Sequence, residues 1–252
     1  MRILLSNDDG IYAPGLKILY KELKKLGQVW VVAPIEEKST TGHSLTIHKP
    51  LRITRLSDDF YSVNGSPADC VYLAVRQIIK AKPDLVISGI NRGANLAQDV
   101  YYSGTVSAAR EACILGIPAL AVSVAIDFKN LNESQVNYRS AAKMALKLIK
   151  MMGEWKLPRH TFLNLNVPDM PFAKIKGIKT ARQGFRFYGG NILRRKDHRG
   201  KDYYWIGGCY RGFAKEGQTD CSVIEESYAS LTPIKLDSTD LQFMASLPEV
   251  LK

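Results

Sequence analysis

Short apolar strand patterns alternate with helical patterns up to residue 167, and this alternation constrains the fold most. Strand patterns, several of them continuous runs of β-branched residues, lie at 2–6, 29–33, 85–88, 119–124 and 162–167. Apolar residues at helical spacing lie between most of these runs, at 14–26, 67–80, 106–115 and 135–152. Continuous apolar strands that alternate with helices are typical of a mostly parallel sheet with helices on both faces. We therefore expect an α/β fold.

The remaining segments predict β-structure added to this core. Residues 46–55 alternate and are followed by 60–63, which predicts a β-hairpin within 45–63. Beyond residue 170 the alternation weakens, and 171–252 reads as a β-rich excursion that ends in a helix, a strand and a terminal helix at 222–228, 229–234 and 238–247. Since no repeat and no obvious linker interrupts the chain, we expect one domain over 1–252, with its core at about 1–170.

Composition limits the class of protein. The chain has 252 residues, of which 46% are hydrophobic, and no apolar run approaches the roughly 18 residues of a membrane helix. The N-terminus reads as a first strand and not as a signal peptide. We expect a soluble, cytoplasmic protein with no membrane partner. The four cysteines form no CxxC pair and are expected to be reduced thiols.

The net charge of +11 is concentrated in one stretch. Residues 174–201 hold ten lysines or arginines and one acidic residue, Asp197. The stretch can be a solvated face, a positive field for an anionic substrate, or a nucleic-acid surface. Because no recognised nucleic-acid motif accompanies it, nucleic acid is not expected to be the main partner.

Two adjacent carboxylates follow the first predicted strand, in Asn7-Asp8-Asp9-Gly10. Such a cluster is common in turns. However, neighbouring carboxylates repel each other, and a hard divalent cation with oxygen ligands would relieve the repulsion. In parallel sheets ligands bind beyond the carboxyl ends of the strands, which is where Asp8 and Asp9 stand.

Polar loops follow two further predicted strands. The loop after the second strand contains Ser39, which can be a neutral oxygen ligand or a capping residue, and His43, which more often has a structural role. The loop after the third strand contains Asn91 and Asn95, whose amide oxygens could reach a cation or a ligand. These loops should meet the first at one edge of the sheet.

A fourth motif, Ser103-Gly104-Thr105, opens a predicted helix. Exposed N–H groups at a helix start can bind an anion, although ordinary capping is the alternative. An ion beside such a start could polarise a phosphoryl oxygen and lower the pKa of a water molecule. Together the four motifs indicate metal-assisted hydrolysis of a phosphate ester.

Several long motifs in order then identify a resemblance. The chain resembles the SurE (survival protein) family of metal-dependent nucleoside 5′-monophosphate phosphohydrolases over nearly its whole length. The motifs are MRILLSNDDGIYAPG, VVAPIEEKSTTGHSLTIH, VNGSPADCVYLA, DLVISGINRGANLAQDVYYSGTVSAAREA, GIPALAVS, NLNVP, ARQGFRFYGG, YYWIGG and TDCSVIEESYASLTPI.

The resemblance implies a Rossmann-like α/β core with a β-hairpin extension and a C-terminal segment exchanged between subunits of a homodimer or homotetramer. It also implies 5′- and often 3′-nucleotides as substrates, with short polyphosphate for some members. The site residues it implies fall into two sets. The resemblance implies that one divalent cation per subunit, Mg or Mn, is held by Asp8, Asp9, Ser39 and Asn91. It also implies that Asn95, Ser103, Gly104 and Thr105 line the pocket that contacts phosphate.

The resulting hypothesis is a nucleotide phosphatase in which water attacks phosphorus and Asp8 or Asp9 accepts its proton. Attack by a carboxylate, giving an aspartyl phosphate, is the second mechanism. A dinucleotide enzyme is disfavoured because the first turn reads NDDGIYAPG and not GxGxxG. A non-catalytic regulator that binds nucleotide or RNA is the alternative function.

Overall fold

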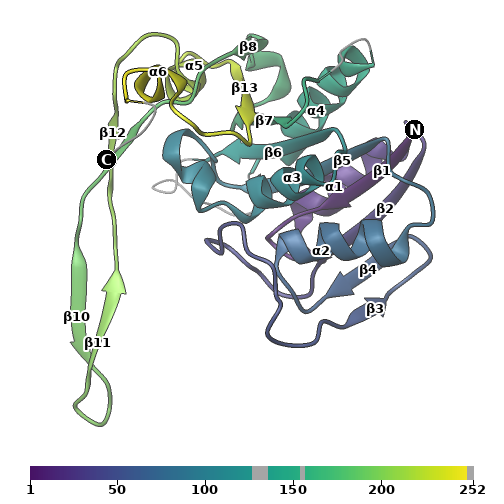
Figure 1. The fold of residues 1–252 in the computed structure, drawn as a ribbon, viewed down its shortest axis with the longest axis horizontal. Helices are drawn as coiled ribbons and strands as arrows, with labels where there is room; N and C mark the ends of the chain where they lie inside the picture. The colour runs from purple at the N-terminus through teal and green to yellow at the C-terminus, as the bar shows by residue number, and fades with distance from the viewer. Residues whose placement is uncertain (127–135, 154–156, 249–252) are drawn as a thin grey trace.

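The computed structural model of the chain describes residues 1–126, 136–153 and 157–248. Within them a central sheet of nine strands has the order β3-β4-β2-β1-β5-β6-β7-β13-β8 (Figure 1). Its strands are β1 (Arg2–Ser6), β2 (Gln28–Pro34), β3 (Ile53–Arg55), β4 (Phe60–Val63), β5 (Leu85–Arg92), β6 (Ala119–Ala125), β7 (Thr161–Pro168), β8 (Ile178–Thr180) and β13 (Ala229–Lys235).

The middle of the sheet is parallel, as predicted. Strands β4, β2, β1, β5, β6 and β7 all pair in parallel with their neighbours, whereas β3 and β13 run antiparallel to β4 and β7. The chain moves from β1 to β2 on one side and later to β5 on the other. The carboxyl end of β1 therefore lies at a topological switch point, where ligands of open α/β sheets bind.

Helices cover both faces of the sheet, which confirms the predicted α/β class. Along β1, Ile3 and Leu5 pack in one core cluster and Leu4 in another, because successive side chains of a strand point to opposite faces. The first cluster contains the apolar faces of α1 (Pro14–Leu23) and α4 (Tyr138–Met152). The second contains those of α2 (Pro67–Leu73) and α3 (Gly104–Ile114).

The hairpin predicted within 45–63 is present but shorter than expected. Strand β3 begins at Ile53, so residues 46–52 are not part of a strand. Both the backbone N–H and the hydroxyl of Thr46 donate to the Asp69 carboxylate of α2, at 2.8 and 2.6 Å. Pro50 has no N–H to give to a ladder. These tertiary contacts hold the segment against α2 instead of in the sheet.

Two helix predictions need correction at their ends. The predicted 67–80 helix begins with a capping box of Ser66 and Asp69, but α2 ends at Leu73 and continues as a π-helical turn, η1 (Ala74–Ile78). The predicted 135–152 helix begins at Tyr138, and residue 135 lies outside the described residues. The N–H of Asn137 donates to the Asp169 carboxylate at 2.7 Å, which fixes the chain just before the helix.

Beyond β8 the chain forms a long two-stranded arm that leaves the sheet (Figure 1). Its base pairs β9 (Arg186–Tyr188) with β12 (Tyr210–Phe213), and its tip pairs β10 (Ile192–Lys196) with β11 (Asp202–Ile206). This confirms the predicted β-rich excursion. The basic residues of the tip are exposed.

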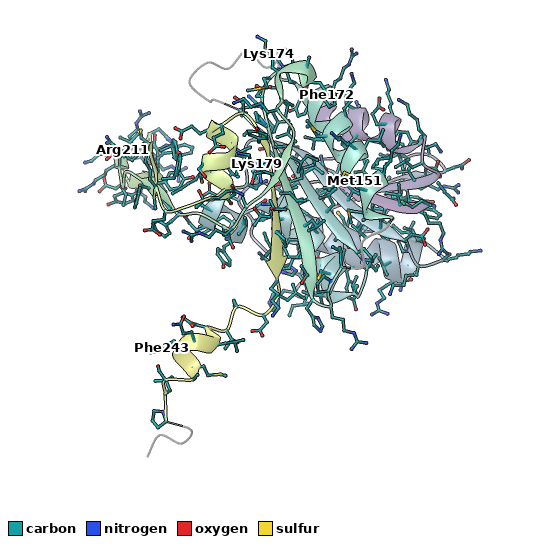
Figure 2. The ribbon with its side chains drawn as sticks, turned by 90° about the horizontal axis from the view of Figure 1, so that it is seen from above. Met151, Phe172, Lys174, Lys179, Arg211 and Phe243 are labelled. Atoms are coloured by element: carbon teal, nitrogen blue, oxygen red, sulfur yellow. The ribbon has the colours of Figure 1, made fainter. Side chains whose placement is uncertain are left out.

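The C-terminal helices are shorter than the sequence suggests. Helix α5 (Asp220–Glu225) replaces the predicted 222–228, because Ser227 adopts a left-handed backbone conformation that ends it. Helix α6 (Leu241–Met244) replaces 238–247 and stands away from the sheet with Phe243 (Figure 2). Most of the stability of a short helix comes from packing against the rest of the protein, so a segment that packs against nothing forms only a short helix. Across the described ranges, none of the helices combines the length and apolar character that a bilayer crossing requires.

Candidate active site

The loops after β1, β2 and β5 meet at one edge of the sheet, because these strands are neighbours in the order β2-β1-β5. The N–H of Lys38 donates to the Asp8 carbonyl at 2.8 Å, which joins the second loop to the first. The N–H of Arg92 donates to Asp9 Oδ2 at 3.2 Å, which joins the end of β5 to the first loop. The structure thus brings the three predicted polar segments together.

Asp8 is a buried carboxylate held by the start of α3. The Thr105 hydroxyl donates to Asp8 Oδ1. A Cβ added to Gly104 would lie 2.6 Å from the Asp8 Cβ, so only glycine allows the helix to come this close. Burial raises the pKa of Asp8, and the hydrogen bond from Thr105 opposes that rise. The candidate cation corner and the candidate phosphate site are therefore in direct contact.

Asp9 is less buried than Asp8, yet its surroundings also disfavour the charged form of its carboxyl group. Burial first, and then the negative charge of Asp8, raise the pKa of Asp9 to about 7, while the hydrogen bond from Arg92 opposes the rise. Glu37 adds a smaller repulsion to both carboxyls. Two carboxylates and a third acid gather here, and a cation would relieve their repulsion.

Asn91 lies at the end of a strand and not in the predicted loop. Strand β5 was expected to end at 88 but runs to Arg92, and its pairing with β6 is irregular between Ser88 and Asn91. The Asn91 amide Nδ2 donates to the Gly93 carbonyl at 2.8 Å. This bond orients the side chain and leaves its Oδ1 as the atom that can accept from, or ligate, a partner.

Ser39 lies in the exposed loop after β2. Its hydroxyl donates to Glu37 Oε1 at 2.6 Å, so its oxygen keeps lone pairs for a cation. Our sequence reasoning gave Glu37 no role. The Glu36-Glu37 pair is visible in the sequence, but nothing in it indicates which of the two acids turns toward Ser39.

Ser103 caps α3, as the capping alternative expected. Its Oγ accepts from the Val106 N–H at 3.0 Å. The helix begins at Gly104, two residues before the predicted start at 106. The first-turn N–H groups have no acceptor within the helix and carry a partial positive charge. The backbone N–H of Thr105 is directed at the Asp8 carboxylate and opposes the rise of its pKa, so the helix start can receive an anion beside Asp8.

Asn95 is buried and anchors the segment between β5 and α3. Its Nδ2 donates to Ser123 Oγ at 2.8 Å, and its backbone N–H donates to Asn166 Oδ1 at 2.8 Å. Its carbonyl accepts from the amides of Asn164 and Asn166. These bonds show a structural role for Asn95. The contact of Asn95 with phosphate stays a prediction.

The donor set of this corner fits a hard divalent cation. No group of three or more His, Cys, Asp or Glu side chains in the described part of the chain is placed to hold a metal. A cation here would therefore combine two carboxylates with amide and hydroxyl oxygens. Such oxygen ligands suit Mg²⁺ or Mn²⁺ and do not suit the softer metals that thiolates bind.

His43 has a structural partner, in agreement with the structural role favoured from the sequence. Its Nε2 lies 2.9 Å from Oε2 of Glu111, a buried acid in α3. This contact ties the Ser39 loop to the helix that begins beside Asp8.

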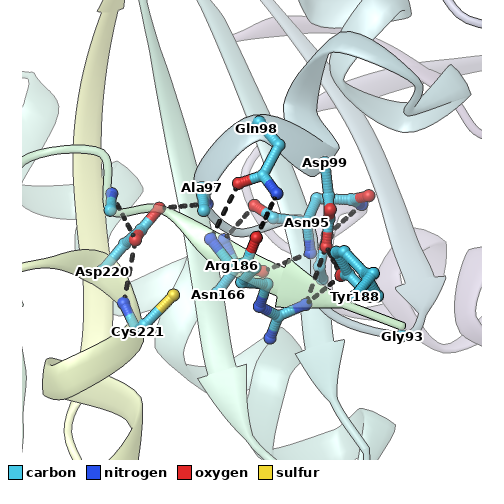
Figure 3. A network of polar contacts seen from close by, with 12 residues as sticks. Gly93, Asn95, Ala97, Gln98, Asp99, Asn166, Arg186, Tyr188, Asp220 and Cys221 are labelled. Carbon is cyan, nitrogen blue, oxygen red and sulfur yellow. Dashed lines mark hydrogen bonds and ion pairs between the residues drawn. The ribbon is translucent and has the colours of Figure 1, made fainter. Parts of the chain in front are cut away.

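A polar network that the sequence did not predict joins the base of the arm to η2 (Ala97–Tyr101), the turn that precedes α3 (Figure 3). Arg186 Nη1 and the Tyr188 hydroxyl both donate to Asp99 Oδ2, at 2.8 and 2.6 Å. The Gln98 amide pairs with both the N–H and the carbonyl of Arg186. The ARQGFRFYGG motif was its one sequence signal, and it gave no partner for Arg186.

Comparisons with known proteins agree with this geometry. A family model described as "Survival protein SurE" matches residues 3–190. The chain is 46% identical over 247 residues to "5'-nucleotidase SurE" of Geotalea daltonii, covering 98% of each chain. It is 45% identical to "5'-nucleotidase SurE" of Natranaerobius thermophilus, covering 98% of this chain and 97% of that one. The crystal structure of the SurE protein from Aquifex aeolicus is 41% identical, with a TM-score of 0.85 and 98% coverage of both chains.

Proposed function

Because the chain belongs to the survival protein SurE family, we propose that it is a metal-dependent phosphatase that hydrolyses nucleoside 5′-monophosphates to nucleoside and phosphate. Relatives matched over nearly their whole length carry the name 5'-nucleotidase. We extend the proposal to 3′-monophosphates and short polyphosphate as secondary substrates.

One observation carries the proposal most strongly. The start of α3 lies directly against Asp8, through the Thr105 hydroxyl and the close approach of Gly104. A phosphate bound at the helix start would therefore lie beside a cation bound at the carboxylates. Metal-assisted hydrolysis of a phosphate monoester uses both of these partners at one place.

The proposed cation ligands are Asp8, Asp9, Ser39 and Asn91, for one Mg²⁺ or Mn²⁺ per subunit. When bound, such a cation supplies a Lewis acid for the phosphoryl oxygens and a lowered pKa for water. The start of α3 at Ser103–Thr105 would steady the phosphoryl oxygens. We assign water as the nucleophile and Asp8 or Asp9 as the acceptor of its proton, because each carboxylate has one oxygen held by a donor of the protein, Thr105 for Asp8 and the Arg92 N–H for Asp9. The alternative is a phosphorylated Asp8.

The test is release of inorganic phosphate from AMP with Mn²⁺, compared with the same protein in excess chelator. We expect release with the cation and none with the chelator. Asp8→Asn should abolish turnover while circular dichroism shows an unchanged fold. An active Asp8→Asn protein that needs no cation would refute the assignment, and borohydride trapping of phosphorylated Asp8 would replace the water mechanism.

The alternative function, a non-catalytic regulator that binds nucleotide or RNA, has one supporting observation. The arm tip carries exposed basic residues beside exposed aromatic ones, such as Arg195 paired with Tyr203. Tight RNA binding by the chain without any phosphate release from AMP would favour the regulator.

We further propose that the chain forms a homodimer or homotetramer with its C-terminal segment exchanged between subunits. The apolar side chains of the segment have no cover within the described chain. They are 45% to 62% exposed: Leu241, Phe243, Met244 and Leu247. A second copy would bury them, as exposed apolar patches of this kind require.

A further inference from the structure

A cavity of about 930 Å³ lies beneath the base of the arm. Its walls come from the segment before η2, the end of β6, strands β9 and β12 of the arm, and α5. Leu96, Ile126 and Phe213 give it apolar walls, and Tyr188 and Tyr210 give it half-exposed aromatic ones. We call this space the arm cavity. Its size and mixed lining are those of a small-molecule site.

The arm cavity shares a wall with the candidate active site. Ala94 lines the cavity and stands two residues after Arg92, whose N–H donates to Asp9. Asp99 also lines it, and its carbonyl accepts from the Ser103 N–H at 3.1 Å. The stretch that forms this wall therefore contacts the proposed cation ligand Asp9 at one end and the start of α3, the proposed phosphate site, at the other.

The sheet gives the same spatial relation. Asn91 lies at the end of β5, and the cavity residue Ala125 ends β6, the next strand. Neighbouring strands are about 5 Å apart. A molecule with its phosphate at the ends of β1 and β5 would therefore need to extend across one or two strands to enter the cavity, which is the reach of a nucleoside.

The aromatic side chains of the cavity contact each other and Arg186. The Tyr188 and Tyr210 ring centroids lie 6.1 Å apart, and the Arg186 guanidinium lies 5.1 Å from the Tyr210 ring. The Tyr188 hydroxyl and Arg186 both bind the Asp99 carboxylate (Figure 3). Aromatic rings held in this way give a stacking surface at low entropic cost.

From the shared wall and the aromatic lining, we propose that the arm cavity binds the nucleoside half of the substrate, with the base against Tyr210. The inference rests on the proposed function and deepens it. It makes this cavity the source of any preference for nucleotides over simple phosphate monoesters, because a small ester can reach the cation corner without entering the cavity.

The test compares Tyr210→Ala with the wild type on AMP and on p-nitrophenyl phosphate, in the presence of Mn²⁺. We expect the KM for AMP to rise at least about fivefold, since loss of base stacking has effects of this size or larger. The constants for p-nitrophenyl phosphate should not change. Tyr210→Phe keeps the ring and should behave as the wild type. Tyr204→Ala, at a tyrosine of β11 outside the cavity that is 59% exposed against 49% for Tyr210, is the control and should also be silent.

The outcomes separate the two proposals. If the wild type releases phosphate from neither substrate, the proposed function fails. If it hydrolyses both, but Tyr210→Ala leaves the KM for AMP unchanged or weakens both substrates equally, the cavity assignment alone is wrong. Equilibrium binding of adenosine to the metal-loaded wild type, lost in Tyr210→Ala and kept in Tyr210→Phe, would support it without turnover.

Discussion

The Thr105 hydroxyl donates to Asp8, so this residue orients a carboxylate in addition to its predicted place beside phosphate. The Thr105 hydroxyl and the Thr105 backbone N–H both act on this carboxylate, so Thr105 fixes the orientation of a proposed cation ligand. Partners that orient a ligand in this way are worth about 10- to 100-fold in metal affinity or activity. We therefore expect a single residue, Thr105, to influence the affinity of the protein for its cation.

Replacing Thr105 with Val removes the donor while keeping the shape of the side chain. We expect Mn²⁺ affinity, measured by calorimetry on the intact protein, to fall about 10- to 100-fold. Thr105→Ser keeps a hydroxyl and is the control, which should bind nearly as the wild type does. Equal affinity in Thr105→Val and the wild type would contradict the orienting role.

The Asp9 carboxyl predicts that stabilisation by metal depends on pH. Its pKa is raised from 3.8 to about 7 by burial and by the charge of Asp8, with Glu37 repelling it and Arg92 attracting it. The folded metal-free chain therefore binds a proton that the unfolded chain does not. That contribution to stability is present at low pH and is lost as pH rises through about 7.

A cation must displace this proton, so the rise in Tm caused by Mn²⁺ should be small at about pH 5.5 and larger at about pH 8. Thermal melts with and without Mn²⁺ at the two pH values measure the difference. In Asp9→Asn, which removes this titrating carboxyl, the rise should depend less on pH, with Asp8 as the remaining ligand whose pKa is raised by burial. A wild-type rise of the same size at both values would contradict the prediction.

At the scale of the element, the important property of α3 is how closely its first turn approaches Asp8. Ser103 ends the preceding turn and caps the helix, and the absence of a side chain at Gly104 lets the first turn reach Asp8. The predicted start at 106 was two residues late because capping by Ser103 and continuation by Gly104 and Thr105 are both consistent with a loop until the packing against Asp8 is known.

Gly104→Ala tests this approach. The added Cβ would lie 2.6 Å from the Asp8 Cβ and 2.8 Å from its Oδ2, so Asp8 or the helix must move. We expect kcat/KM for AMP to fall by about 100-fold or more, since small displacements at a reacting centre have this effect. Gly190→Ala is the matched control, because a Cβ there meets no atom within 4 Å. Full activity in Gly104→Ala would show that the contact is dispensable.

Sequence patterns located elements better than they located their ends. The strands of the core were predicted from apolar runs, yet β5 continued to Arg92 and β3 began only at Ile53. In both cases a partner distant in the chain decided the limit. Strand β6 pairs with β5 up to Arg92, and Asp69 holds Thr46 away from the ladder.

At the scale of the whole molecule, the arm and the C-terminal segment both leave the sheet (Figures 1 and 2). A two-stranded hairpin is marginally stable alone in water. A four-residue helix with exposed apolar side chains is less stable still. Both extensions support the homodimer or homotetramer proposed above.

Phe243→Asp should weaken that assembly, because a charge at this position cannot be buried without a partner. We expect light scattering after size exclusion to show a smaller species than the wild type at the same concentration. Met151→Asp, at another exposed apolar position, on α4, is the control and should not change the mass (Figure 2). A wild-type chain that is already monomeric would remove the basis for the exchange.

The sequence by itself determined the parallel core, the helices on its two faces and the polar segments after β1, β2 and β5, because these follow from local apolar spacing and from the order of strands along the chain. It also supplied the family resemblance. Only the tertiary structure decided that Thr105 holds Asp8, that Glu37 turns toward Ser39, and that Arg186 and Tyr188 close a cavity against Asp99. These contacts join residues brought together by packing, and no local pattern records which distant side chain a polar group will meet.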